Sequence, residues 1–159
     1  MPAIVDMLSL ERHILTTIPL ARAMELHVSE YDGNRLALAA PLAANVNDKG
    51  CAFGGSLASL ATLAGWGLIC LKLGELGITA DVFVQDSTIV YLAPVWDEIV
   101  AEAAAAPDES WEHFVAAIRA RGRARITIDA EVAAAEGGSV PARITARFVA
   151  KRTDQPRPA

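Results

Sequence analysis

The fold is decided by the stretch N-V-N-D-K-G-C-A-F-G-G-S at residues 45–56, which leads directly into a long apolar segment at residues 57–73. The first part is polar and contains glycine, as loops do, and the second has the length and composition of a helix. A Gly-Gly pair at a helix start leaves backbone N–H groups free at the positive end of the helix dipole. Such an end binds an anion, or an oxygen that becomes negative during a reaction. We therefore predict a site for developing negative charge, with Gly54 and Gly55 as backbone donors and the Asn47 amide as a side-chain donor.

Length and composition bound the class of protein. The chain has 159 residues, 53% hydrophobic and 21% charged, which suits one domain that builds its core without disulfides or a structural metal. We place this domain at residues 1–152 and expect a disordered tail at residues 153–159. The net charge of −5 argues against nucleic acid as the main partner. Cys51 and Cys70 form neither a disulfide framework nor a zinc motif, so we expect a cytoplasmic protein with no metal and no cofactor.

One segment is long enough to raise the question of a membrane span. Residues 54–71 carry no charged side chain, and about 20 apolar residues suffice to cross a bilayer. Three hydroxyl-bearing residues and four glycines dilute the segment, and predicted strands of a soluble domain flank it. We therefore predict a helix that is buried all round inside the protein, and no membrane span.

Periodicity predicts a mixed α+β domain around this helix, which we expect to run over residues 55–75 and to end at Gly77. Strands are expected at residues 24–31, 36–41, 81–92, 99–105, 124–132 and 142–151. The last two alternate strictly between apolar and polar residues, so they predict a half-exposed antiparallel hairpin that turns at Gly137-Gly138. A strongly curved antiparallel sheet wrapped around the long central helix would cover the apolar surface of that helix.

Turn and helix signals fix the remaining elements. Asp32-Gly33-Asn34 predicts a hairpin turn between the first two strands. Residues 4–17 have the apolar spacing of a short amphipathic helix, which Pro19 is expected to stop. A second small helix is expected to open at Pro107-Asp108.

The order of elements and the loop together resemble the hotdog fold of acyl-thioester enzymes. Many hotdog thioesterases carry Asn, a Gly three residues later, then His-Gly-Gly, and an acidic residue nine positions after that His. The corresponding positions here are Asn47, Gly50, Phe53-Gly54-Gly55 and Thr62. Tyr91-Leu92-Ala93-Pro94 resembles the aromatic-x-x-Pro that ends the following strand in those proteins.

The closer resemblance is to the thioesterase-like family named after the C-terminal domain of YiiD, and it extends over roughly residues 5–151. It is carried by Ile18-Pro19, Ala40-Pro41-Leu42, Asn45-x-Asn47, Phe53-x-Gly55-Ser56, Leu63-x-Gly65-Trp66-Gly67, Tyr91-Leu92-x-Pro94-Val95 and Gly122-Arg123. Some stand-alone members are linked to decarboxylation of malonyl-ACP. The resemblance implies an enzyme that acts on an acyl thioester of acyl carrier protein (ACP) or coenzyme A. It also implies a homodimer or homotetramer with the site between subunits.

The residues at the motif positions favour one reaction over another. Thioester hydrolysis needs a general base or a carboxylate nucleophile, but the two positions that would supply proton transfer hold Thr62 and Phe53. Decarboxylation of a malonyl thioester needs only donors for the enolate oxygen and a dry pocket. We therefore predict malonyl-ACP decarboxylation, with Asn47, Gly54 and Gly55 as the catalytic donors and Phe53 excluding water. Hydrolysis by an acyl-ACP or acyl-CoA thioesterase, and a non-catalytic acyl-thioester binding module, stay open as alternatives.

Further residues are candidates for substrate contacts. Ser56 and Thr62 are expected to touch the substrate, although a threonine on a buried helix also bonds a carbonyl one turn back. Asp86 lies mid-strand, where an inward carboxylate could supply a base for hydrolysis and an exposed or paired one could not. Arg123 and Arg125 share one strand face and are predicted to meet the phosphates of a pantetheine carrier or an acidic carrier protein. The alternative for these arginines is a solvated outer face.

Two residues of the loop receive other interpretations. We expect Asn45 to shape the loop, as asparagine does in turns. Cys51 has no histidine beside it in the motif, so a Cys-His mechanism is not favoured. The three histidines, His13, His27 and His113, are scattered over other elements and are interpreted as surface residues or as structural ones.

Overall fold

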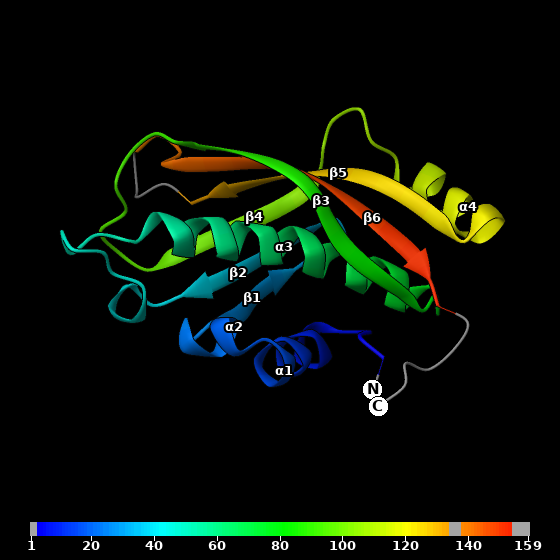
Figure 1. Cartoon of the computed structure of the whole chain (residues 1–159), viewed down its shortest axis with the longest axis horizontal. Helices are drawn as coiled ribbons and strands as arrows, with labels where there is room; N and C mark the ends of the chain where they lie inside the picture. The colour runs from blue at the N-terminus through cyan, green and yellow to red at the C-terminus, as the bar shows by residue number, and fades with distance from the viewer. Residues whose placement is uncertain (1–2, 134–137, 154–159) are drawn as a thin grey trace.

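The structure is a computed structural model that describes residues 3–133 and 138–153. Its elements in chain order are α1 (Met7–Thr17), α2 (Pro19–Ala23), β1 (His27–Tyr31), β2 (Arg35–Ala40), the short 3-10 helix η1 (Leu42–Ala44), α3 (Gly54–Glu75), β3 (Ala80–Tyr91), β4 (Ile99–Ala105), α4 (Trp111–Arg121), β5 (Arg123–Val132) and β6 (Ala142–Arg152). Figure 1 shows the strands curving around α3. Helices α1 and α2 lie beside β1, and α4 lies next to the start of β5.

The strands form one antiparallel sheet in the order β1-β2-β4-β5-β6-β3. The predicted α+β class and the curved sheet around a central helix are therefore confirmed. Strands β5 and β6 pair directly, and alternate residues such as Ala124, Ile126 and Ile128 point into the core. Strict alternation predicted these two strands well because one face of each packs on α3 and the other meets solvent.

The sheet-facing side of α3 forms the centre of the core. Leu60, Ala64 and Leu68 are fully buried there. Gly65 approaches the sheet so closely that an added Cβ would lie 3.0 Å from the ring of Phe148. The helix and the sheet thus pack in direct contact, which fixes where α3 begins relative to the strands.

The opposite side of α3 corrects one expectation. Gly55, Ser59, Thr62 and Trp66 recur every three or four residues and stay half-buried, so the helix is not buried all round within one chain. Within the described ranges α3 alone has the length and hydropathy of a membrane span, and 56% of its most apolar window is buried. This proportion is consistent with the core helix of a soluble protein.

Several element boundaries differ from the predicted ones. Pro19 ends α1 as expected, but it also opens α2, because proline is well suited to the first turn of a helix. Helix α4 begins at Trp111 instead of Pro107-Asp108, since the Ser110 hydroxyl caps it by accepting the His113 amide at 3.2 Å.

Other predictions of turns and ends have mixed outcomes. The turn at residues 32–34 forms as predicted, with the Asp32 carboxylate accepting the amides of Asn34 and Arg35, both at 2.8 Å. Strand β1 begins at His27, three residues later than expected. Residue 137 of the predicted Gly137-Gly138 turn, and residues 154–159 of the predicted tail, lie outside the described residues.

Candidate active site

The first turn of α3 presents unused backbone donors. Phe53 occupies the cap position without a capping side chain, and its carbonyl accepts the amides of Ser56 at 2.9 Å and Leu57 at 3.1 Å. For the amides of Gly54 and Gly55 no acceptor is found in the described part of the chain. Two N–H groups at the positive end of a 22-residue helix are therefore available to an external oxygen.

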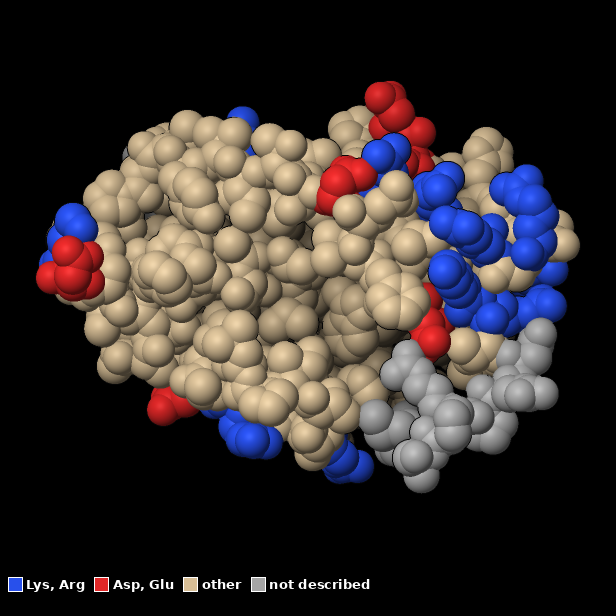
Figure 2. All heavy atoms as spheres, viewed as in Figure 1, with Lys and Arg blue, Asp and Glu red and all other residues tan. Residues whose placement is uncertain are grey.

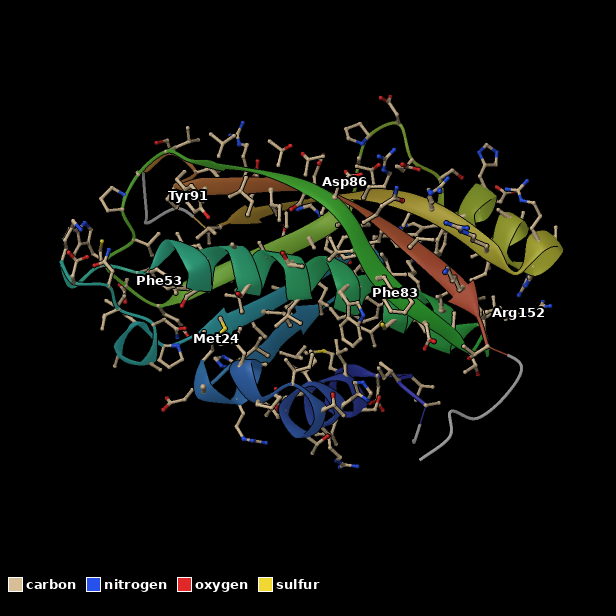
Figure 3. All side chains as sticks on the ribbon, in the orientation of Figure 1. Met24, Phe53, Phe83, Asp86, Tyr91 and Arg152 are labelled. Carbon is tan, nitrogen blue, oxygen red and sulfur yellow. The ribbon has the colours of Figure 1, made fainter. Side chains whose placement is uncertain are left out.

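Two aromatic rings flank these amides. The Phe53 ring lies so close to Gly55 that a side chain there would overlap it, and an added Cβ on Gly54 would lie 3.4 Å from the ring of Tyr91. The Tyr91 hydroxyl donates to the Gly54 carbonyl at 3.3 Å. Figure 3 shows Phe53 and Tyr91 at the same end of the molecule. With exposed fractions of 55% and 54%, these rings do not close a dry pocket within a single chain.

Asn47 lies in a tight turn whose hydrogen bonds fix the orientation of its side-chain amide. Its Oδ1 accepts the Lys49 amide at 2.8 Å, and its Nδ2 donates to the sulfur of Cys51 at 3.2 Å. The backbone amide of Asn47 also donates to the Cys51 carbonyl at 2.8 Å. Sequence reasoning did not anticipate the contact with Cys51. An amide nitrogen carries two hydrogens, so one remains for another acceptor.

Asn45 braces the loop from inside, as predicted. It is 3% exposed, and its Nδ2 donates to the carbonyls of Met24 at 3.0 Å and Pro41 at 2.8 Å. Its own carbonyl accepts the amide of Phe53 at 2.7 Å. This one residue ties the end of α2 and the end of β2 to the residue that starts α3.

Asp86 does not face the core. The Arg147 side chain contacts its carboxylate through Nε at 3.0 Å and Nη2 at 2.5 Å, on the outer face of the sheet. Val84 pairs with the buried Phe148 and therefore lies on the α3 side of the sheet, although it is half exposed at the open edge. Strict alternation would place Asp86 on the same side. A bulge between Val84 and Asp86 reverses the facing, because one extra residue shifts every later side chain to the other face. The possibility of an inward base at this position is therefore wrong.

The two hydroxyl candidates differ in their surroundings. Ser56 is buried in the first turn of α3 at 9% exposure. Thr62 lies on the half-buried side of the helix, and no bond from its hydroxyl to a carbonyl one turn back is found among residues 3–133 and 138–153. Its hydroxyl is thus free to contact whatever covers this side of α3.

Arg123 and Arg125 lie far from the glycines along the sheet. Tyr91, at one end of β3, contacts Gly54, whereas Ala80, at the other end of β3, pairs with Arg152, next to the Lys151 that pairs with Arg123. A single chain therefore does not bring the predicted phosphate contacts and the predicted catalytic donors together. Figure 2 shows this separation: Lys and Arg side chains gather at the α4–β5 end, whereas uncharged side chains cover the face over α3 and over the end of β3 that leads to Tyr91.

Strand β3 is an open edge of the sheet. It is twelve residues long, and no other described strand pairs with its outer side. Large apolar side chains along and just beyond it are about half exposed: Phe83, Val84, Val90, Tyr91 and Leu92. An apolar edge of this length, next to the half-buried side of α3, has the properties of an interaction surface.

The remaining titratable groups near α3 show no metal site. In the described ranges no three His, Cys, Asp or Glu residues cluster closely enough to hold an ion. Burial raises the pKa of the Cys70 thiol well above its usual value, so it stays protonated. His13 of α1 stacks on Trp66 of α3 with ring centroids 5.9 Å apart, and desolvation lowers its pKa.

Comparisons with known proteins identify the fold. Residues 7–152 match the model of the family YiiD_C, described as "Putative thioesterase (yiiD_Cterm)". A protein of unknown function from Chlorobaculum tepidum TLS is 30% identical, with a TM-score of 0.84 over 91% of this chain and 93% of that one. A "putative thioesterase" from Shewanella oneidensis is 26% identical, with a TM-score of 0.80 over 91% and 96%. A "Probable Thioesterase" from Pseudomonas aeruginosa shares the fold at 21% identity, with a TM-score of 0.77 over 96% and 100%.

Proposed function

Since the chain belongs to the YiiD_C family of thioesterase-like hotdog proteins, we propose that it is an enzyme that acts on short acyl thioesters, and that its reaction is the decarboxylation of malonyl-ACP to acetyl-ACP. The observation that carries the proposal is the pair of unused amides of Gly54 and Gly55 at the start of α3. The thioester oxygen accepts from these amides. Loss of carbon dioxide then leaves the electron pair as an enolate on that oxygen, and a solvent proton completes the acetyl group.

The second N–H of Asn47 acts as the side-chain donor. Because Lys49 holds Oδ1 and the Cys51 sulfur holds one Nδ2 hydrogen, the amide is kept in one orientation before substrate arrives. A fixed donor stabilises a developing oxyanion more than a mobile one, since no reorganisation is needed during the reaction.

The surroundings of the helix start support decarboxylation over hydrolysis. Phe53 and Thr62 occupy the positions where a proton-transferring side chain would serve hydrolysis, and neither can act as a base at neutral pH. Asp86 is held by Arg147 on the outer face of the sheet. An apolar surround also destabilises the ionised malonyl carboxylate relative to neutral carbon dioxide, which assists the loss of carbon dioxide.

A second copy of the chain completes the pocket. The apolar edge of β3 pairs with β3 of that copy about a two-fold axis, which makes the two edge strands antiparallel. This pairing covers Val84 and Tyr91 and the half-buried side of α3. The Phe53 ring then lies in the interface and excludes water from the amides of α3. Homodimer formation is therefore part of the proposed function.

Product analysis tests the reaction. The protein is mixed with malonyl-ACP, and separately with malonyl-CoA, and the thioesters are followed by mass spectrometry. The proposal predicts an acetyl thioester that carries one deuterium when the reaction is run in deuterium oxide. Free carrier thiol with released malonate would instead identify a thioesterase, and binding without any product would identify a non-catalytic module.

Asn47 gives the sharpest single-residue test. Asn47→Ala should lower kcat by about 100-fold, since a preorganised oxyanion donor supplies about 3 kcal/mol, while the Tm stays close to that of the wild type. Asn34→Ala is the matched control, because Asn34 lies in the exposed turn between β1 and β2, away from the start of α3. Unchanged turnover by Asn47→Ala would remove this residue from the mechanism.

A further inference from the structure

Exposed cations gather at the end of the sheet that is remote from the start of α3. We define the basic patch as Arg121 of α4, Arg123 and Arg125 of β5, and Lys151 of β6: the three arginines line one groove, and Lys151 pairs with Arg123. No ion pair of the three arginines is found among the described residues, and Asp81 of β3 lies opposite Lys151 at the border of the patch. In a chain with a net charge of −5, such a concentration of positive charge marks a place where an anionic partner is attracted.

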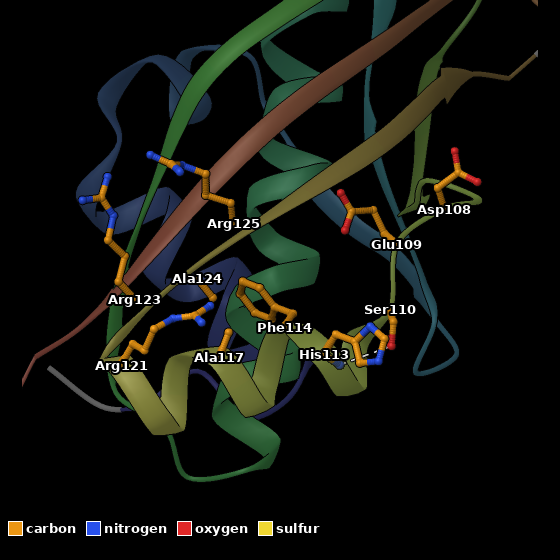
Figure 4. A pocket seen from close by; sticks show the side chains of 10 residues that line it. All are labelled: Asp108, Glu109, Ser110, His113, Phe114, Ala117, Arg121, Arg123, Ala124 and Arg125. Atoms are coloured by element: carbon orange, nitrogen blue, oxygen red, sulfur yellow. Dashed lines mark hydrogen bonds between the residues drawn. The ribbon is translucent and has the colours of Figure 1, made fainter.

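The basic patch borders an open groove of about 600 Å³ between α4 and β5. Figure 4 shows Arg121, Arg123 and Arg125 on one side of the groove and Asp108 and Glu109 on the other. Strand β4 ends opposite residue 128. The next residue along this edge of β5, Thr127, is already bonded, because its amide donates to the Glu109 carboxylate at 2.8 Å and its carbonyl accepts the Ala106 amide at 3.0 Å. The guanidinium groups at the other side of the groove are the groups that suit acceptor oxygens.

The proposed two-fold pairing of β3 determines which site the basic patch serves. In an antiparallel pair centred on the strand, Tyr91 of one chain lies next to residue 80 at the start of the partner's β3. From there the sheet continues through β6 to the Arg123 end of β5, since residue 80 pairs with Arg152 and Lys151 pairs with Arg123. Three strand spacings of about 4.8 Å place the patch of one protomer about 15 Å from the α3 start of the other.

We propose that the basic patch is the docking surface for an acidic carrier protein, whose substrate arm then enters the site at the start of α3 in the partner protomer. This inference rests on the proposed function, because it takes the acyl thioester site and the β3 dimer from it. The patch has the breadth of a protein-docking surface, because its four cations extend over α4, β5 and β6.

Charge complementarity makes the docking selective. The rest of this acidic chain repels an acidic carrier, so attraction is confined to the patch and orients the carrier toward the dimer interface. Binding is then strongest at low ionic strength, because exposed charges are screened within about 10 Å at 0.1 M salt. Substrates carried by coenzyme A depend less on the patch, since coenzyme A has no acidic protein surface that could dock on it.

Charge reversal tests the docking surface. In the double variant Arg121→Glu/Arg123→Glu, KM for malonyl-ACP should rise at least about 10-fold with kcat unchanged, while kcat/KM for malonyl-CoA changes less than about two-fold. Arg12→Glu on α1 is the matched control, because Arg12 is exposed and lies outside the patch. An equal loss with both substrates, or no loss with either, would overturn the carrier-docking role.

Binding of unloaded carrier separates this inference from the proposed reaction. Calorimetry with holo-ACP that bears no acyl group should show binding to the wild-type protein in low salt and at least about a 10-fold weaker Kd for the double variant. This result supports docking whatever product the malonyl assay gives. A wild-type protein that does not bind the carrier even in low salt would overturn the inference without bearing on chemistry at α3.

Mixed dimers test whether docking serves the partner protomer. One chain carries Arg121→Glu/Arg123→Glu and the other carries Asn47→Ala, and the two are co-expressed with different tags. The assay uses malonyl-ACP far below KM. If the patch serves the partner, one site of each mixed dimer combines an intact Asn47 with an intact patch, so about half of the wild-type activity per dimer returns. If the patch serves its own protomer, the site with an intact Asn47 has a reversed patch and a KM raised at least about 10-fold, so the activity stays below about a tenth of the wild type, which would overturn the proposed geometry.

Discussion

The two edge strands of the sheet, β1 and β3, differ in length and in how the rest of the chain covers them. Strand β1 has five residues, and the Glu11 carboxylate of α1 accepts the Val28 amide at 2.7 Å. Strand β3 has twelve residues, with large apolar side chains about half exposed. The chain itself therefore covers the short first edge with α1. On β3 the Trp66 Nε1 donates to the Val82 carbonyl at 3.1 Å, but no described strand pairs with the outer side of β3. An open apolar edge offers unpaired backbone groups to another chain and is a predicted site of pairing or aggregation.

This difference determines where function can arise. The open edge ends at Tyr91, whose hydroxyl donates to Gly54 at the start of α3. The edge formed by β1 lies beside α1 and α2, and α3 lies between this edge and β3 in the view of Figure 1. In the proposed dimer, covering the open edge also covers the candidate site, whereas the first edge lies away from it.

The largest effect should follow from a charge on the open edge. Val84 is 47% exposed, so Val84→Lys should leave the single chain folded, but a lysine covered by a second copy would be buried without a partner charge. Light scattering coupled to size-exclusion chromatography should show a monomer in place of the dimer, and turnover should fall below detection. Ser29→Lys on β1 is the control and should keep both assembly and activity. A monomeric but fully active Val84→Lys variant would contradict the comparison of the two edges.

The edge formed by β1 should respond in stability and not in assembly. Glu11→Ala removes the acceptor of the Val28 amide, which should lower the free energy of unfolding by about 1–2 kcal/mol. Urea denaturation at one fixed protein concentration measures this, because the stability of an oligomer depends on concentration. Glu30→Ala, at an exposed carboxylate on the same strand, should change stability much less. A loss of the dimer in Glu11→Ala would show that the two edges are not independent.

The smallest effect should be a pH dependence from His13, which lies on the helix that covers the edge formed by β1. Desolvation lowers its pKa from 6.5, so below about pH 6.5 the unfolded chain binds more protons than the folded one, and stability falls as the pH falls. Melting curves between about pH 7.5 and pH 5 should therefore show a smaller acid-induced drop in Tm for His13→Gln than for the wild type. Identical drops would mean that His13 is not desolvated in solution.

The sequence predicted the parts of the fold in which one chain alone determines the pattern. Strict alternation marked β5 and β6 because solvent covers one face of each and α3 the other. The half-buried side of α3 could not be foreseen, since its small and apolar residues continue the same uncharged composition as the side that faces the core. The facing of Asp86 was likewise hidden, because nothing in the local pattern signals the bulge that precedes it.

The candidate site was predicted at the level of backbone chemistry. Gly54-Gly55 after a polar loop indicated free amides at a helix start, and the structure has no acceptor for them among the described residues. The sequence also predicted that Asn45 shapes the loop, and its buried side chain does hold the loop through the carbonyls of Met24 and Pro41. It did not reveal that Asn47 shares its amide with Lys49 and Cys51, because such contacts depend on how the turn closes. Neither could it show that the arginines lie at the other end of the sheet.

The most direct test of the central claim is to watch the amides at the start of α3 while a thioester mimic binds. The measurement is the amide nitrogen and proton chemical shifts of Gly54 and Gly55 during titration with a malonyl-carrier analogue that cannot lose carbon dioxide. The account predicts that both resonances move downfield and that their hydrogen exchange slows as the analogue saturates. If the analogue binds and perturbs other residues while the resonances of Gly54 and Gly55 stay in place, the thioester oxygen is held elsewhere and the account is contradicted.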